Sequence, residues 1–264
     1  AVFYRTNAQS RAFEDAFRRA GMPYAVIGTL RFYDRAEIKD LMAYLKLTHN
    51  PNDNVSFKRI INVPRRGIGK TSVESLEKEA LRRGFSLWQT IPFAAEAGLG
   101  RGAVNALNSF AALIKSFISL KEKESVKQIA ENIIAGSGYL KELENERSPE
   151  AETKIENIKE LISAIDDFER RSPDKSLSGY LTQIALVSDI DSLDESNGKI
   201  TLMTLHLAKG LEFENVFVCG LEEGLFPIGE SAFSPAELEE ERRLMYVGMT
   251  RAKKHLYLCW ACER

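Results

Sequence analysis

The sequence predicts an α/β protein in which one sheet is formed by the two ends of the chain and is interrupted by a long helical insertion. Near both ends, short segments are rich in β-branched and aromatic residues, which is typical of strands. Between about residues 29 and 196, apolar residues recur at helical spacing instead. Because strands at both ends need partners, we expect the ends to meet in space. The predicted strands are Ala1–Tyr4, Tyr24–Ile27, Ile200–Leu205, Asn215–Cys219 and His255–Trp260.

The insertion is predicted from apolar stripes, which we interpret as the core faces of helices. These stripes run over residues 38–45, 107–118, 126–134 and 155–168. We expect Asp34 to cap the first of these helices and Gly136 to end the third. Residues 189–198 are acidic and polar, so we interpret them as the linker back to the sheet. The predicted boundaries are therefore 1–28 and 197–264 for the α/β part and 29–196 for the insertion.

Composition places the chain among soluble globular proteins. It has 264 residues, of which 44% are hydrophobic and 28% are charged, and this excludes disordered and fibrous classes. The longest apolar run, residues 256–262, falls far short of the roughly 20 residues that cross a bilayer. The chain opens with no signal-peptide pattern. It begins at Ala1 without an initiator Met, so we expect a piece of a longer protein. Its three cysteines favour a reducing, cytoplasmic setting.

Charge is nearly balanced overall but is segregated along the chain. The net charge is −2, which by itself does not favour nucleic acid. Residues 56–70 nevertheless hold five basic residues and no acid, and residues 211–241 hold nine acids and no base. Residues 242–254 again hold five bases and no acid. Local fields, rather than the sum, therefore decide which partners the chain can bind.

Two short patterns resemble a phosphate-binding loop and a redox cysteine pair, but we interpret neither as a functional site. Residues 67–71 look like the end of a phosphate-binding P-loop, but the first glycine of that motif is replaced by Pro64. Cys259 and Cys262 have the spacing of a redox pair but lie in or just after a strand. A zinc site would need two more ligands at paired spacing, so we predict no metal site.

The first candidate site lies in residues 201–227. A strand ends near Leu205, and the loop that follows carries His206, Lys209, Gly210 and Glu212. Ligands of α/β sheets gather at the carboxyl ends of strands, so we expect these residues there. Glu212 could accept hydrogen bonds from a ribose, and a solvated turn is the alternative.

The second candidate site ends a helix predicted from residue 235. Ser234, Pro235 and Glu237 form a helix start with a capping box. Acids at the start of this helix and bases at its end suit the helix dipole. Neither feature explains Gly248 so late in the helix. Arg251, just before a strand, could reach a phosphate.

The third candidate site is a basic turn. Residues 59–81 contain a glycine turn that leads into a helix with a capping box formed by Thr71 and Glu74. Free amides at a helix start, flanked by Arg and Lys, suit contact with a nucleic-acid backbone without base reading. A solvated basic turn is the alternative.

In order along nearly the whole chain, these segments resemble the C-terminal half of the UvrD/PcrA/Rep family of superfamily-one DNA helicases. The matching stretches are YRTNAQSR (4–11), FYDRAEIKDLMAYLKL (32–47), VPRRGIG (63–69), TLHLAKGLEF (204–213), EEGLFP (222–227) and EEERRLMYVGMTRA (239–252). The resemblance implies that the α/β part is a partial RecA-like motor domain, called 2A. It implies that the helical insertion is domain 2B.

The resemblance also implies roles for single residues. Arg251 matches an arginine that reaches the ATP γ-phosphate and is the expected catalytic residue. Glu212 matches a carboxylate on the nucleotide ribose, with Gly210 beside it. The expected contacts with single-stranded DNA are Arg5, Asn7, Thr204 and His206. The expected contacts with duplex DNA are Gly67, Gly69, Lys70 and Thr71, with charge from Arg65 and Arg66. Leu207, Met249 and Ile228 depart mildly from the family pattern.

No Walker A or Walker B motif is present, so the resemblance implies a fragment of an ATP-dependent 3′–5′ helicase that is inactive alone. ATP and Mg²⁺ would be cofactors of the full-length enzyme and would not be bound by this fragment by itself. The expected partners are single-stranded DNA, duplex–single-strand junctions, the protein's own N-terminal motor domain, and repair or replication proteins. The expected location is the bacterial cytoplasm, in association with the nucleoid.

Two other functions remain open. The chain could be a stand-alone module for DNA binding or partner docking, although such a module has no use for Glu212 and Arg251. It could also be the helicase part of a helicase–nuclease, although the YRTNAQSR and EEGLFP matches disfavour this.

Overall fold

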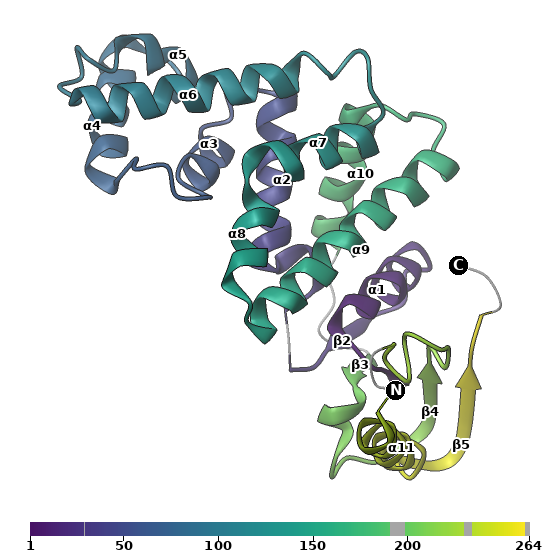
Figure 1. Cartoon of the computed structure of the whole chain (residues 1–264). Helices are drawn as coiled ribbons and strands as arrows, with labels where there is room; N and C mark the ends of the chain where they lie inside the picture. Colours follow the sequence, from purple (N-terminus) through teal and green to yellow (C-terminus); the bar gives the residue numbers. More distant parts are fainter. Residues whose placement is uncertain (29, 191–198, 230–233, 262–264) are drawn as a thin grey trace. The chain divides into compact units, whose positions relative to one another are not determined.

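The computed structural model describes residues 1–28, 30–190, 199–229 and 234–261, and the chain divides into two compact units (Figure 1). The first unit comprises Ala1–Arg35 and Val187–Arg264, and the second comprises Ala36–Leu186. The prediction of an α/β fold with a helical insertion is confirmed. The identity of these units as domains 2A and 2B stays a prediction.

The first unit contains one parallel sheet formed by both ends of the chain. Its strands lie in the order β2-β3-β1-β4-β5. Phe3 is level with Met203 on one neighbouring strand and with Val218 on the other, so the N-terminal strand is central. Each predicted strand is confirmed to within a few residues. The strands are β1 (Val2–Tyr4), β2 (Tyr24–Val26), β3 (Ile200–Thr204), β4 (Phe213–Cys219) and β5 (Ala252–Cys259).

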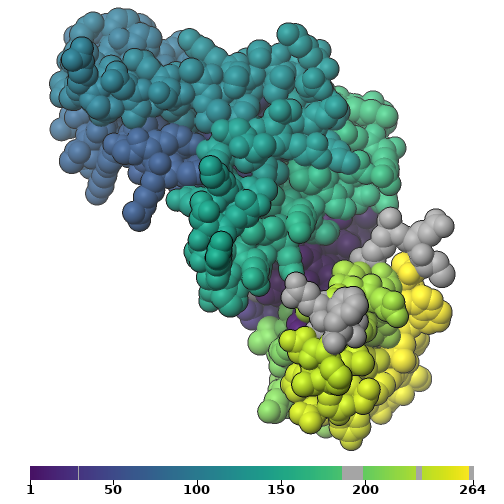
Figure 2. Space-filling model, viewed as in Figure 1, coloured from purple at the N-terminus to yellow at the C-terminus, as the bar shows by residue number. Residues whose placement is uncertain are grey.

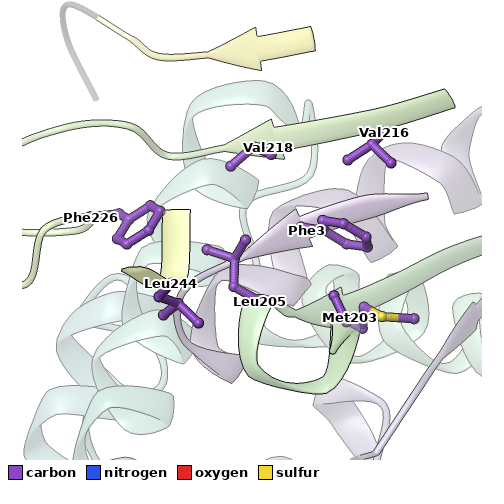
Figure 3. Packing of buried hydrophobic residues seen from close by; sticks show 8 residues of the cluster. Phe3, Met203, Leu205, Val216, Val218, Phe226 and Leu244 are labelled. Carbon is purple, nitrogen blue, oxygen red and sulfur yellow. The ribbon is translucent and has the colours of Figure 1, made fainter. Parts of the chain in front are cut away.

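Helices cover the two faces of this sheet. On one face, α1 (Ser10–Arg19) packs Phe13 and Phe17 against Val2 and Tyr4. On the other face, α11 (Pro235–Met249) contributes Leu244 to a cluster with Phe3 and Leu205 (Figure 3). Neighbouring residues of a strand point to opposite faces, which is why Phe3 belongs to a different cluster from Val2 and Tyr4. The described part of this unit also contains the short 3₁₀ helices η1 (Asn7–Gln9), η2 (Phe32–Asp34) and η4 (Leu205–Ala208).

Gly248 is required where α11 crosses η4. A Cβ atom built on Gly248 would lie 2.3 Å from Leu205 Cδ2 and 3.8 Å from Val218 Cγ2. Leu205 is fully buried, so it has little room to move away. This close approach explains the late glycine that helix capping left unexplained.

The second unit is helical, and its described segments from α3 to α5 lie together at one end of it (Figures 1 and 2). The predicted stripes are core faces, as Leu107, Ile114, Ile133 and Ile165 are each almost fully buried. The elements are α2 (Ala36–His49), α3 (Asn54–Ile60), α4 (Lys70–Arg83), α5 (Leu87–Thr90), η3 (Ile91–Phe93), α6 (Arg101–Ile118), α7 (Val126–Ser137), α8 (Tyr139–Glu146), α9 (Pro149–Arg171) and α10 (Leu177–Ile190).

Two predicted helix boundaries in this unit are wrong. Asp34 ends η2, and the residue directly before α2 is Arg35. Gly136 lies inside α7, where its Cβ position is 3.2 Å from the Phe117 ring. The helix ends instead at Ser137, and its C-cap is Gly138, whose φ of 81° suits glycine.

The capping box predicted from Thr71 and Glu74 for the helix α4 is also wrong. Thr71 is the second residue of α4, and the N-cap is Gly69. The predicted return linker falls mainly outside the described residues, since α10 runs to Ile190 and residues 191–198 are not described.

Candidate nucleotide and nucleic-acid sites

The predicted site residues of the first unit lie at two opposite edges of the sheet. Arg5 follows β1 and Thr204 ends β3, so both lie at the carboxyl edge. Glu212 directly precedes β4, and Arg251 directly precedes β5, so both lie at the amino edge. The expectation that Gly210 and Glu212 lie at the carboxyl ends of strands is therefore wrong. After β3 ends, the chain passes through η4 to the opposite edge of the sheet before β4 begins. Because β4 is about 20 Å long at ~3.3 Å per residue, the two edges lie far apart.

At the amino edge, the Arg251 guanidinium is fixed by three protein acceptors. Its Nε donates to the Val247 carbonyl at 3.0 Å, and its Nη2 donates to Thr250 Oγ1 at 3.0 Å. Its Nη1 donates to the carbonyl of Leu211 at 3.3 Å. The last bond joins the end of α11 to the turn that carries Gly210 and Glu212. Residues from two distant sequence motifs therefore meet at this edge.

The turn before β4 presents an open surface beside Arg251. Gly210 has φ of 84°, and a Cβ built there would have nothing within 4 Å, so the backbone conformation requires glycine and the space beside it is free. The Glu212 side chain is 58% exposed and lies 3.4 Å from Lys253 Nζ. Such an exposed ion pair is weak. The carboxylate is thus accessible to a hydroxyl donor, and the guanidinium beside it suits an anionic group.

At the carboxyl edge, Arg5 forms a bidentate ion pair with Glu241 of α11. Arg5 Nε lies 3.0 Å from Oε1 and 3.1 Å from Oε2, and Nη2 lies 2.8 Å from Oε1. The Glu241 side chain is only 7% exposed. Sequence reasoning missed this residue, although Glu241 shares the buried face of α11 with Leu244 and Gly248. A glutamate at that helical spacing was the available signal.

The other three carboxyl-edge residues differ in exposure. Thr204 is buried at the end of β3, whereas His206 is exposed in η4. Asn7 begins η1, and its Oδ1 is buried without a hydrogen-bond partner among the described residues. Desolvation by the surrounding protein is the main cause that lowers the pKa of His206, and the charge of the Arg5 guanidinium lowers it further. The charges of Glu241 and Glu240 act in the opposite direction and raise this pKa. Arg5, His206 and Glu241 therefore form one electrostatic group.

In the second unit, the basic turn is exposed and is held from inside by Asn62. Gly67, Gly69, Lys70 and Thr71 are all exposed, as is Arg65. Asn62 Oδ1 accepts hydrogen bonds from the amide of residue 66 at 2.7 Å and from the amide of residue 68 at 3.3 Å. Gly67 has φ of 76°, which the turn requires. The turn is therefore a fixed loop that leads directly into α4.

Arg66 points into the unit rather than toward solvent. Its Nη1 donates to the carbonyls of Ile60 at 3.0 Å and Pro64 at 3.1 Å. Its Nη2 donates to the Tyr44 hydroxyl at 2.6 Å and to the Ser137 carbonyl at 3.3 Å. The guanidinium thereby joins the turn to α2 and α7. In this arrangement Arg66 holds the turn in place.

Two more of the five bases are paired within the unit. Lys58 lies 3.0 Å from Glu77, and Arg59 lies 2.8 Å from Asp40. By contrast, the Lys70 side chain is 91% exposed and lies 3.9 Å from Glu74. The outward charge of the turn is therefore carried by Arg65 and Lys70, which is less than the sequence count of five indicates.

The described residues contain no group of three or more His, Cys, Asp or Glu side chains that could hold a metal ion. Cys259 ends β5 with a free thiol, and Cys262 lies outside the described residues. Of the P-loop-like residues, 67–69 lie between α3 and α4, and Lys70 and Thr71 begin α4, so the stretch follows a helix and not a strand. Within the described ranges, no helix is both long enough and apolar enough to cross a membrane.

Comparison with known proteins gives one consistent result. The family model described as "UvrD-like helicase C-terminal domain" matches residues 1–263. The ATP-dependent DNA helicase PcrA of Bacillus subtilis is 48% identical over 264 residues, covering 98% of this chain and 36% of that protein. The ATP-dependent DNA helicase PcrA of Staphylococcus aureus is 43% identical over 268 residues, covering 100% of this chain and 37% of that protein. The chain thus spans little more than a third of the length of these relatives.

Proposed function

The chain belongs to the UvrD-like helicase family, and on that premise we propose that it is the C-terminal part of an ATP-dependent 3′–5′ DNA helicase. In this proposal the first unit is motor domain 2A, and the second unit is the inserted domain 2B. The observation that carries the proposal is the anchoring of Arg251 to the Leu211 carbonyl, beside Glu212.

The amino edge supplies half of the ATP site. Glu212 accepts hydrogen bonds from the ribose, and the open turn at Gly210 lets the nucleotide approach the backbone. Arg251 donates to the γ-phosphate and stabilises the negative charge of the transition state, because its guanidinium is already held in place. Bound ATP supplies the phosphoanhydride bond whose hydrolysis drives movement.

The remaining half of the ATP site belongs to the rest of the protein. No group of three or more His, Cys, Asp or Glu side chains in the described part of the chain could hold a metal ion, and the sequence contains no Walker A or Walker B motif. We therefore assign the magnesium ligands and the phosphate cradle to a separate motor domain. This chain alone is expected not to hydrolyse ATP.

DNA contacts fall on the carboxyl edge and on the basic turn. Arg5, Asn7, Thr204 and His206 contact single-stranded DNA at the carboxyl edge. The amides of residues 67–71 contact the backbone of duplex DNA, with charge from Arg65 and Lys70. Closure of the two motor domains on ATP moves the strand contacts along DNA.

Replacement of Arg251 in the full-length protein tests the proposal. Arg251→Ala should lower ATP turnover on the order of 10³-fold, the scale of an arginine finger, while ATP binding weakens much less. Arg242→Ala is the matched control, because Arg242 lies on α11, the helix that precedes Arg251, and is 70% exposed and paired with Glu239. A fall of less than about tenfold for Arg251→Ala would show that Arg251 is only a surface charge.

A further inference from the structure

We propose that Glu241 is a positioning residue for single-stranded DNA, because it holds the Arg5 guanidinium at the carboxyl edge without itself contacting the strand. This inference rests on the proposed function, in which Arg5 contacts DNA. It assigns a role to a residue that belongs to neither the nucleotide set nor the DNA set above.

The geometry fixes both the backbone and the side chain of Arg5. Its own amide and that of Thr6 each donate to Gln9 Oε1 at 2.9 Å, which holds the start of the loop. Its Nε and Nη2 pair with both oxygens of Glu241. An arginine carries five N–H donors in a rigid fork, so this pair leaves Nη1 outside it, as a donor for a phosphate oxygen.

Burial makes this carboxylate more than a surface charge. The Glu241 side chain is 7% exposed and the Arg5 side chain is 19% exposed, so water screens the pair little. A buried carboxylate is costly unless it is paired, and an apolar side chain would suit its position on α11 beside Leu244. An apolar residue at this position could not hold the long, flexible Arg5 side chain in place. Because Glu241 holds it before DNA arrives, the entropy cost of ordering that side chain is not added to the free energy of DNA binding.

The test uses the full-length protein and a labelled oligothymidylate, with the dissociation constant measured at several salt concentrations. The variants are Arg5→Ala, Glu241→Gln and the double variant. Glu240→Gln is the matched control, because it removes the same charge from a neighbouring side chain that is 72% exposed. Melting temperature and affinity for blunt duplex DNA are measured for each variant.

If Glu241 acts through Arg5, Arg5→Ala should weaken single-strand binding about tenfold, as for a charge-assisted hydrogen bond. Glu241→Gln should weaken it by about threefold to tenfold. The double variant should bind as Arg5→Ala does, because the second change has nothing left to act through. Glu240→Gln should bind as tightly as the unchanged protein or slightly more tightly, and duplex affinity should stay unchanged throughout.

Three results would overturn the inference. Unchanged single-strand binding by Glu241→Gln would mean that the carboxylate does not position Arg5, and tighter binding would mean that it only repels DNA. Additive losses in the double variant would mean that Glu241 acts through the fold of α11. No loss in Arg5→Ala would remove the proposed Arg5 contact and this inference together, whereas the Arg251 test of ATP turnover would be unaffected.

Arg5→Lys provides a second route if Glu241→Gln does not fold. Lysine keeps the positive charge near Glu241 but cannot form the bidentate pair. Weakening of single-strand binding by about threefold or more would support positioning by the fork, and binding equal to that of the unchanged protein would contradict it.

Discussion

Gly248 of α11 lies so close to Leu205 of η4 that a Cβ atom on residue 248 would be only 2.3 Å from Leu205 Cδ2, so the buried Leu205 side chain would have to move. The contact lies between the two edges of the sheet, since η4 follows β3 and α11 precedes β5. The crossing from the carboxyl edge to the amino edge therefore depends on a glycine in a helix.

Gly248→Ala should destabilise the first unit by about 1–2 kcal/mol. Overpacking of a core typically costs about 1–3 kcal/mol, and the better helix propensity of alanine offsets up to about 1 kcal/mol of this. The control is Gly102→Ala in α6, where a Cβ would have nothing within 4 Å. Chemical denaturation should show the first variant less stable and the control equally or more stable. A stabilised Gly248→Ala variant would mean that Leu205 moves away easily.

Arg66→Ala should destabilise the second unit and Arg65→Ala should not, although the two residues are neighbours. Loss of Arg66 removes a hydrogen-bond donor from the Ile60, Pro64 and Ser137 carbonyls, so we expect the second unit to lose about 2–3 kcal/mol of stability. Arg65 is exposed, so Arg65→Ala should leave stability unchanged within about 0.5 kcal/mol. Thermal unfolding of both variants measures the difference. Equal melting temperatures would contradict the inward role of Arg66.

Removal of Arg65 and Lys70 together should reduce the salt dependence of junction binding. Each lost phosphate contact lowers the slope of log affinity against log salt by about 0.9 for duplex DNA, so two lost contacts should lower it by about 1.8. Binding to single-stranded DNA should change little, because the proposed function places that strand at the carboxyl edge of the sheet. Salt titrations of full-length Arg65→Ala/Lys70→Ala on both DNAs measure this. Equal losses on both would indicate a general electrostatic patch, and no loss on either would indicate a solvated turn.

His206 should make single-strand binding and stability depend on pH in opposite directions. Its pKa is lowered in the fold, so between this lowered value and 6.5 the unfolded chain binds more protons, and stability rises with pH. DNA phosphate favours the protonated ring, so single-strand affinity should rise as pH falls below about 6.5. His206→Gln should remove both dependences. An unchanged pH profile of affinity in this variant would exclude a contact between His206 and the strand.

The sequence predicted the sheet because its strands are short runs of β-branched and aromatic residues that need partners. It predicted the start of α11 for a similarly local reason, since Ser234 Oγ accepts from the amide of residue 237. The same reasoning failed at Thr71, because both Gly69 and Thr71 can begin a helix and the turn fixed by Asn62 selects Gly69. Local patterns thus located most elements and left some of their boundaries open.

The inward or outward direction of side chains could not be predicted. Arg66 binds Tyr44 and Ser137, which lie far from it in the sequence, so its direction depends on how three segments pack. The Arg5–Glu241 pair likewise joins residues 236 positions apart. Gly210 and Glu212 were assigned to the wrong edge of the sheet, because no pattern in residues 205–212 indicates that the chain crosses the sheet before β4 begins. Residue roles that depend on such long-range contacts require the structure.

The central place of β1 in the sheet also affects how the protein is made. Its neighbours β3 and β4 lie about 200 residues later in the chain, so at about 5–20 residues per second a ribosome needs roughly 10–40 s to supply them. During that interval β1 has both of its hydrogen-bonding edges unpaired. The second unit, by contrast, is contiguous and can fold as it emerges, which shortens the loop that β1 must close. Slowing translation after β4 should therefore change the yield of folded protein less than slowing it between β1 and β3.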